Sequence, residues 1–391
     1  MDCHEVHAHD DAFRSDHPGR PHAAQPHHHA PLTRCRADEG RVPNALMAEY
    51  YVQRASAGLI LSEATSVTPM GVGYPDTPGI WSTDQVRGWT NVTKALHGAG
   101  GRIFLQLWHV GRISHPMYLH GEAPVAPSAI QPKGHVNLVR PLTGFDTPRA
   151  LETEEIADIV DAYRTGAENA KAAGFDGVEV HAANGYLLDQ FLQSSTNQRS
   201  DLYGGSLENR ARLLLEVIEH IHQATHGELD ISVRLGIDDC LGARGQRPEL
   251  LEHVVPALEQ AGVVALMGSI SIRETFHYML RADAQVQAAF IQGVRHLRQL
   301  TSLPVGFAGF TGSLAQAETL LGDQVCDLVG MSRALFADNQ LVSKSLAGHA
   351  DRVTACRFDG HCFRDKSNPQ LDRVYCCVNE HYKRPASIRY D

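Results

Sequence analysis

Two kinds of apolar pattern alternate along the chain from about residue 57 onward. Short apolar runs bounded by glycine or proline are typical of buried strands, and longer segments with apolar residues three or four positions apart are typical of helices. The pattern predicts strands at 58–61, 102–107, 175–180, 231–235, 263–267, 303–307 and 326–329. It predicts helices at 84–97, 154–173, 207–222, 249–261, 284–300 and 313–321, with Thr153 and Ser206 as N-caps of the second and third.

Repeated strand–helix units form a parallel sheet, which is either open or closed into a barrel. Their span fits an eightfold barrel, although only seven strands are evident and an eighth should precede Arg34. We therefore predict an α/β fold, a TIM (β/α)8 barrel over residues 30–345. A proline- and glycine-bearing insertion interrupts it at about 111–150, and a cysteine-containing extension follows at 346–391.

Residues 1–29 do not supply the missing apolar strand. They hold eight of the 23 histidines of the chain and end in His27, His28 and His29. We expect an irregular His-rich segment there, so that the barrel lacks its first strand and has two unpaired edges. A histidine-rich tract is also typical of a metal-binding tail.

Composition restricts the class of protein. The formal net charge of −10 argues against a nucleic-acid partner, and no apolar run is long enough to span a membrane. The chain starts without a hydrophobic signal region, and its eight cysteines are scattered, which indicates reduced thiols. We expect a cytoplasmic protein with no nucleic-acid or membrane partner, and its association into homo-oligomers stays open.

Polar side chains follow the predicted strands at their carboxyl ends, where barrel enzymes build their sites. His181, Asn184 and Tyr186 follow the strand at 175–180, and Gln106 and Arg234 end two others. Two hydrogen-bond donors beside a weakly acidic hydroxyl are suited to polarising a carbonyl group and protonating the carbon next to it.

Glycines follow the last two strands. Gly309 comes after the strand at 303–307, and Gly330, Ser332 and Arg333 come after the strand at 326–329. Glycines let backbone N–H groups approach a phosphate, and an arginine adds positive charge. Since barrels place phosphate beside the seventh and eighth strands, the pattern predicts a phosphorylated cofactor.

Longer motifs carry a resemblance to a known family. They are Asn-Ala-Leu-Met-Ala-Glu-Tyr-Tyr at 44–51, Ser-Glu-Ala-Thr at 62–65, Gln-Leu-Trp-His-Val-Gly-Arg at 106–112, the segment 181–186, and Tyr-Gly-Gly-Ser-Leu-Glu-Asn-Arg at 203–210. In this order they resemble the Old Yellow Enzyme family of FMN-dependent ene-reductases, which have a TIM-barrel fold. The resemblance covers residues 30 to about 345.

The resemblance implies a role for each of ten residues. Those implied to contact FMN are Thr33 and Ala64 at the flavin, Gln106 at its pyrimidine edge, Arg234 beside the charge of the reduced ring, and Gly309, Ser332 and Arg333 at the phosphate. His181 and Asn184 would hold the substrate oxygen, and Tyr186 would deliver a proton.

The implied reaction uses FMN with NADPH or NADH as hydride donor. The substrate is a small α,β-unsaturated carbonyl (enone) or nitro compound, whose activated C=C bond is reduced. Hydride reaches the β-carbon from the flavin, and Tyr186 protonates the α-carbon. Removing one hydrogen-bond donor to the substrate oxygen typically costs about 2.7–4 kcal/mol of barrier.

The carboxyl-terminal extension is similar to the iron–sulfur segment of the dienoyl-CoA reductase branch, on Cys356, Cys362 and Cys376. That branch has another cysteine where Asp359 stands, and a carboxylate is a poor ligand for a soft cluster. We expect no intact iron–sulfur cluster and assign no metal ligands. A degenerate tail and a different metal held by cysteines and His361 both stay open.

The amino terminus departs from the resemblance. Codons for residues 12–29, read in a shifted frame, permit an apolar strand that joins directly to Ala30. We hypothesise a frame slip in this segment, which the nucleotide sequence tests. If the first strand is missing, two alternative functions follow: an inactive flavin-binding protein, or a metal-binding protein that uses the His-rich segment and the cysteines.

Overall fold

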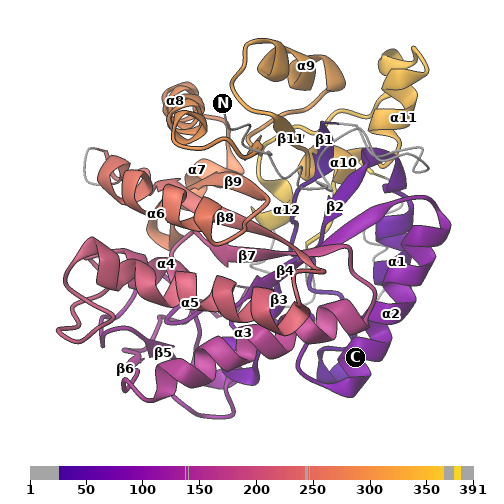
Figure 1. Cartoon of the computed structure of the whole chain (residues 1–391). Coiled ribbons are helices and arrows are strands. Elements are labelled where there is room, and N and C mark those ends of the chain that lie inside the picture. The colour runs from indigo at the N-terminus through magenta and orange to yellow at the C-terminus, as the bar shows by residue number, and fades with distance from the viewer. Residues whose placement is uncertain are drawn as a thin grey trace, which may run out of the picture.

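Eight parallel strands close into a barrel in the computed structural model, which describes residues 26–364 and 374–379 apart from 137, 140, 243, 244 and 246 (Figure 1). The barrel strands are β1 (His27–His29), β2 (Leu59–Leu61), β4 (Arg102–Trp108), β7 (Gly177–Ala182), β8 (Asp230–Asp238), β9 (Ala265–Ile270), β10 (Val305–Phe307) and β11 (Leu328–Gly330). Pairing of β2 with β4 closes the ring. The TIM-barrel prediction is confirmed, as are all seven apolar strands.

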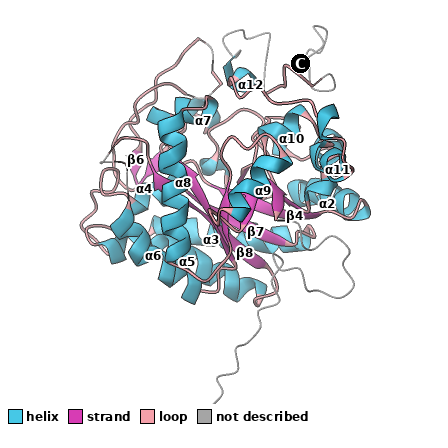
Figure 2. Ribbon diagram, turned by 90° about the horizontal axis from the view of Figure 1, so that it is seen from above, coloured by secondary structure: helices cyan, strands magenta, loops and turns pink. Residues whose placement is uncertain are grey.

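Helices surround the strands, as Figure 2 shows. They are α1 (Ala45–Val52), α2 (Thr83–Gly98), α3 (Glu155–Ala172), α4 (Leu187–Leu192), α5 (Leu207–Thr225), α6 (Pro248–Gln260), α7 (His277–Leu280), α8 (Ala284–Gln299), α9 (Leu314–Gly322), α10 (Arg333–Ala337), α11 (Leu341–Leu346) and α12 (His361–Arg364). The six helices predicted from periodicity are α2, α3, α5, α6, α8 and α9. None of the described helices is long and apolar enough to cross a membrane.

One of the two predicted helix caps was wrong. Ser206 caps α5, because its side chain accepts a hydrogen bond from the backbone N–H of Asn209. Thr153 does not cap α3, whose N-cap residue is Glu154. The Thr153 hydroxyl instead donates to the carboxylate of Asp201 at 2.7 Å. A hydrogen bond to a charged acceptor is stronger than one to a neutral group, so the carboxylate of Asp201 holds the hydroxyl away from the helix end.

The prediction of a missing first strand was also wrong. His27–His29 form β1, which pairs in parallel with β11 on one side and with β2 on the other. Every non-proline residue has the N–H and C=O groups that a sheet needs, so three histidines can complete the ladder although their side chains are polar. The barrel therefore has no unpaired edge at this position.

The three histidine side chains alternate across β1, as strand geometry requires. On the helix side, His27 Nε2 lies 3.1 Å from a carboxylate oxygen of Glu318, and His29 Nε2 lies 2.9 Å from the Tyr50 hydroxyl. His28 lies on the opposite face, and neither of its buried ring nitrogens has a hydrogen-bond partner among the described residues. Burial, with smaller effects of Arg234 and His27, lowers the pKa of His28 to about 3.

Short strands and loops lie beside the carboxyl ends of the barrel strands. The two-residue strand β3 (Thr65–Ser66) extends the sheet beside β4, and β5 (Val125–Ala126) pairs with β6 (Arg149–Ala150) within the predicted insertion. Val136 and Phe145 of the insertion join one apolar cluster with Trp108 and Tyr186. The insertion thus forms an apolar wall next to the end of β7.

Candidate active site

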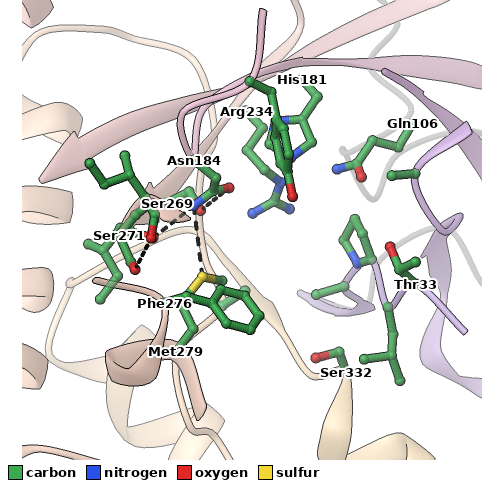
Figure 3. A pocket seen from close by; sticks show the side chains of 18 of the residues that line it. Thr33, Gln106, His181, Asn184, Arg234, Ser269, Ser271, Phe276, Met279 and Ser332 are labelled. Carbon is green, nitrogen blue, oxygen red and sulfur yellow. Dashed lines mark hydrogen bonds between the residues drawn. The ribbon is translucent and has the colours of Figure 1, made fainter. Parts of the chain in front are cut away.

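One pocket at the carboxyl ends of the barrel strands is lined by all ten residues singled out from the sequence. It encloses about 1320 Å³, open mouth included. Figure 3 shows His181 and Arg234 on one side of the cavity and Phe276 and Met279 on the opposite side. The ten residues are Thr33, Ala64, Gln106, His181, Asn184, Tyr186, Arg234, Gly309, Ser332 and Arg333. The structure brings them together from seven strand ends, and their chemical roles stay predictions.

His181, in β7, is a neutral imidazole with an unused polar atom. Burial, and to a smaller extent the charge of Arg234, lowers its pKa well below the usual value. Its Nδ1 atom is buried and has no hydrogen-bond partner among the described residues. Because a buried polar atom without a partner is costly, this atom fits a ligand group in the pocket.

Tyr186 follows β7 and holds a proton at neutral pH. Burial, followed by the influence of Tyr74, raises its pKa well above the usual value of 10.0. The hydroxyl oxygens of Tyr74 and Tyr186 lie 3.0 Å apart. The Tyr186 ring packs edge-on against Trp108 and His181. Its hydroxyl is therefore a positioned, protonated group beside the neutral imidazole. The sequence reading did not identify Tyr74.

Asn184 lines the pocket, but its amide is already engaged. Its Nδ2 group donates to the carbonyl oxygens of Ile270 at 2.8 Å and Ser271 at 2.9 Å, and its Oδ1 accepts from the Ser269 hydroxyl at 3.1 Å (Figure 3). Its backbone is left-handed, with φ of 61°. To hold a substrate oxygen, Asn184 must exchange one of these amide hydrogen bonds for the substrate.

Glu179 is a functional candidate that the sequence analysis missed. Its fully buried carboxylate accepts hydrogen bonds from the Gln106 amide and from Arg234, whose Nε and Nη2 lie 3.2 and 3.1 Å away. A buried charge must be paired, so Glu179 fixes both side chains. The sequence did contain a signal for Glu179, because a carboxylate stands within an apolar strand, two positions before His181. Residues two positions apart in a strand lie on the same face.

Arg333 is a half-buried cation that lines the pocket. Its Nη1 donates to the Leu280 carbonyl oxygen at 2.9 Å, and its guanidinium lies over the Phe310 ring, 4.6 Å from the centroid. It forms no ion pair with a carboxylate in the described part of the chain, and burial lowers its pKa. A half-buried guanidinium without a salt bridge to a described carboxylate suits an anionic group such as a phosphate.

Gly309 lines the same pocket as Arg333. A Cβ atom there would lie 2.7 Å from the Phe307 ring and 2.9 Å from the Phe290 ring, which is too close for a larger residue. Phe276, Met279 and, from the carboxyl-terminal extension, Phe363 add apolar wall. These three come from irregular segments or short helices, and no sequence period indicated them.

Comparisons with known proteins agree with this geometry. The profile of the NADH:flavin oxidoreductase / NADH oxidase family matches residues 27–352. The chain is 37% identical over 330 residues to 12-oxophytodienoate reductase 7 of Oryza sativa subsp. japonica, covering 81% of this chain and 82% of that protein. It is 48% identical over 326 residues to a probable flavin mononucleotide-dependent alkene reductase of Leishmania infantum, covering 82% and 86%.

Solved structures are similar throughout the barrel. The Old Yellow Enzyme homologue from Zymomonas mobilis superposes with a TM-score of 0.71 at 34% identity, covering 83% of this chain and 89% of that one. Morphinone reductase in complex with tetrahydroNAD also gives 0.71, at 39% identity, covering 83% and 87%. This chain belongs to the NADH:flavin oxidoreductase / NADH oxidase family.

Proposed function

We propose that this chain is an FMN-dependent ene-reductase, which uses NADPH or NADH to reduce the activated C=C bond of α,β-unsaturated carbonyl or nitro compounds. Membership of the flavin oxidoreductase family supports the activity class. The observation that carries the proposal is the pairing of His181, neutral and with an unpartnered buried nitrogen, with the protonated hydroxyl of Tyr186 in one pocket.

The residues of the pocket fit FMN. Arg333 is a half-buried cation without a salt bridge to a described carboxylate and suits the phosphate, together with Gly309 and Ser332. Gln106 and Arg234 would face the pyrimidine edge of the ring, and Thr33 and Ala64 would complete its site. When bound, FMN supplies a carrier that accepts hydride from a nicotinamide and passes it to the substrate.

Each polar residue around the substrate position has a separate task. The His181 imidazole donates a hydrogen bond to the substrate oxygen, and Asn184 joins it when its amide leaves a β9 carbonyl. These bonds stabilise the negative charge that develops on that oxygen. Tyr186 gives its proton to the α-carbon, while Tyr74 holds the Tyr186 hydroxyl in place. The apolar cluster around Trp108 limits access of water.

The alternative functions depended on a barrel without its first strand. Strand β1 occupies that position, so the reason for proposing an inactive flavin-binding protein or a metal-binding protein in place of an enzyme was wrong. We also propose a cytoplasmic location without nucleic-acid or membrane partners, on the basis of the acidic net charge and the scattered cysteines.

Oxidation of NADPH in the absence of oxygen tests the function. The purified full chain, loaded with FMN, should oxidise NADPH when 2-cyclohexenone is added and should form cyclohexanone. The allylic alcohol 2-cyclohexen-1-ol is the control, because its double bond lacks an electron-withdrawing group. Without oxygen, no increase in the rate of NADPH oxidation on addition of the enone would refute an ene-reductase, even if NADPH is oxidised once air is admitted.

A further inference from the structure

The carboxyl-terminal extension brings three metal-ligating side chains together outside the proposed active-site chemistry. They are the carboxylate of Asp359, the imidazole of His361 and the thiol of Cys377, and one ligand atom of each lies within 4.8 Å of the others. All three residues are half-buried. Cys377 comes 16 positions after His361, so the cluster joins two segments, 356–364 and 374–379.

We propose that Asp359, His361 and Cys377 form a binding site for one zinc ion. Zinc accepts oxygen, nitrogen and sulfur ligands together, at about 2.0–2.3 Å, and three protein ligands leave a fourth position for water. Ligands of one tetrahedral ion lie roughly 3.3–3.8 Å apart, so small side-chain rotations suffice to close the site. A mixed set with one thiolate is unsuited to an iron–sulfur cluster, which is held by cysteine thiolates.

Neighbouring groups orient two of the ligands. His361 Nε2 lies 3.1 Å from the Tyr375 hydroxyl, and Asp359 Oδ1 accepts a hydrogen bond from the backbone N–H of His361 at 2.9 Å. Such contacts from outside the ligand set are typical of metal sites, where they fix the ring orientation of a histidine ligand. The segment 374–379 is also anchored to α10, since Asn379 donates to the Phe336 carbonyl oxygen.

The site lies next to the proposed phosphate contact. The Phe358 ring, one residue before Asp359, packs against the Arg333 guanidinium at 5.1 Å from the ring centroid, and Phe363 lines the pocket. A zinc ion that joins the two segments would hold both aromatic rings in place. This consequence rests on the proposed function of the pocket, whereas zinc binding itself does not.

Zinc content tests the site directly. The full chain is incubated with zinc, freed of unbound metal by gel filtration and measured by mass spectrometry, for the wild type, Cys377→Ala and the control Cys240→Ala. We expect Cys377→Ala to hold one zinc per chain less than the wild type, and Cys240→Ala to hold as much as the wild type. Comparing variants separates this site from any zinc on the histidines of residues 1–29, which all three chains share.

A second measurement guards against misfolding of the variant. In the wild type, zinc should slow alkylation of Cys377 by iodoacetamide at least tenfold and leave the rate at Cys240 unchanged, as mapped by peptide mass spectrometry. Equal zinc in wild type and Cys377→Ala, or alkylation of Cys377 that zinc does not slow, would overturn the proposal. Iron with acid-labile sulfide in the purified protein would overturn it in favour of a cluster. None of these outcomes depends on enone reduction.

Discussion

Lowering the pH from 7.5 to 5.5 should destabilise the folded chain through the buried histidines of β1, and His28 is the clearest test. Its ordinary pKa is 6.5, and burial first, then the charges of Arg234 and His27, lowers it to about 3 in the folded state. The unfolded chain therefore binds a proton at His28 between these values while the folded chain does not. The contribution of His28 to stability is complete above pH 6.5 and is lost as the pH falls toward 3.

The magnitude follows from the two pKa values. Between pH 7.5 and 5.5, one histidine of this kind lowers the free energy of unfolding by about 1.3 kcal/mol. Burial also lowers the pKa of His29 well below its usual value, so His29 acts in the same direction. The loss at His28 alone, about 1.3 kcal/mol, compares with a typical total stability of about 5–15 kcal/mol.

Substitution of His28 isolates its titration. The free energy of unfolding is measured by urea denaturation, followed by tryptophan fluorescence, at pH 7.5 and pH 5.5 for the wild type and His28→Val. Lost packing is the same at both pH values, so it cancels from the difference between them. That difference should shrink by about 1.3 kcal/mol in His28→Val and should not change in His253→Gln, which alters an exposed histidine.

An unchanged pH dependence in His28→Val would refute this reasoning. It would mean that His28 is protonated equally in the folded and unfolded chains, and therefore that its ring is not buried within the barrel. A smaller pH dependence in the exposed control would show instead that surface histidines dominate the effect.

Three further predictions concern the pocket. Tyr186→Phe should slow reoxidation of the reduced flavin by cyclohexenone about 10²–10⁴-fold without slowing reduction of the flavin by NADPH. The control is Tyr163→Phe, which changes a buried tyrosine outside the pocket lining. Equal reoxidation rates of the two variants in stopped-flow traces would exclude Tyr186 as proton donor. Glu179→Gln should raise the two-electron reduction potential of bound FMN by on the order of 30 mV, because the substitution removes a negative charge beside Arg234. A lowered potential in a redox titration would contradict this role of Glu179. Arg333→Ala should weaken FMN binding about 10- to 100-fold by fluorescence titration, since a charged hydrogen bond is lost, and unaltered affinity would place the phosphate elsewhere.

Periodicity and short apolar runs predicted most of the barrel, because seven of its strands are buried on both faces. The first strand escaped prediction, since three consecutive histidines have no apolar signal although their backbone pairs normally. Most of the polar pocket residues were found because they follow strand ends, whereas Thr33 and Ala64 were identified only through the family resemblance. Glu179 was missed because it lies inside a strand, and Tyr74 and Phe363 because they lie in loops or short helices that have no detectable period.

A single turnover of the reduced flavin tests the proposed activity most directly. The FMN-loaded chain is bleached with one equivalent of NADPH without oxygen and then mixed with 2-cyclohexenone, while its visible spectrum is recorded. We predict that the absorption of oxidised FMN returns and that one cyclohexanone forms for each flavin, whereas cyclohexanone added in place of the enone has no effect. A flavin that stays reduced in the presence of the enone, or a chain that takes up no FMN, would contradict the assignment of this chain as an ene-reductase.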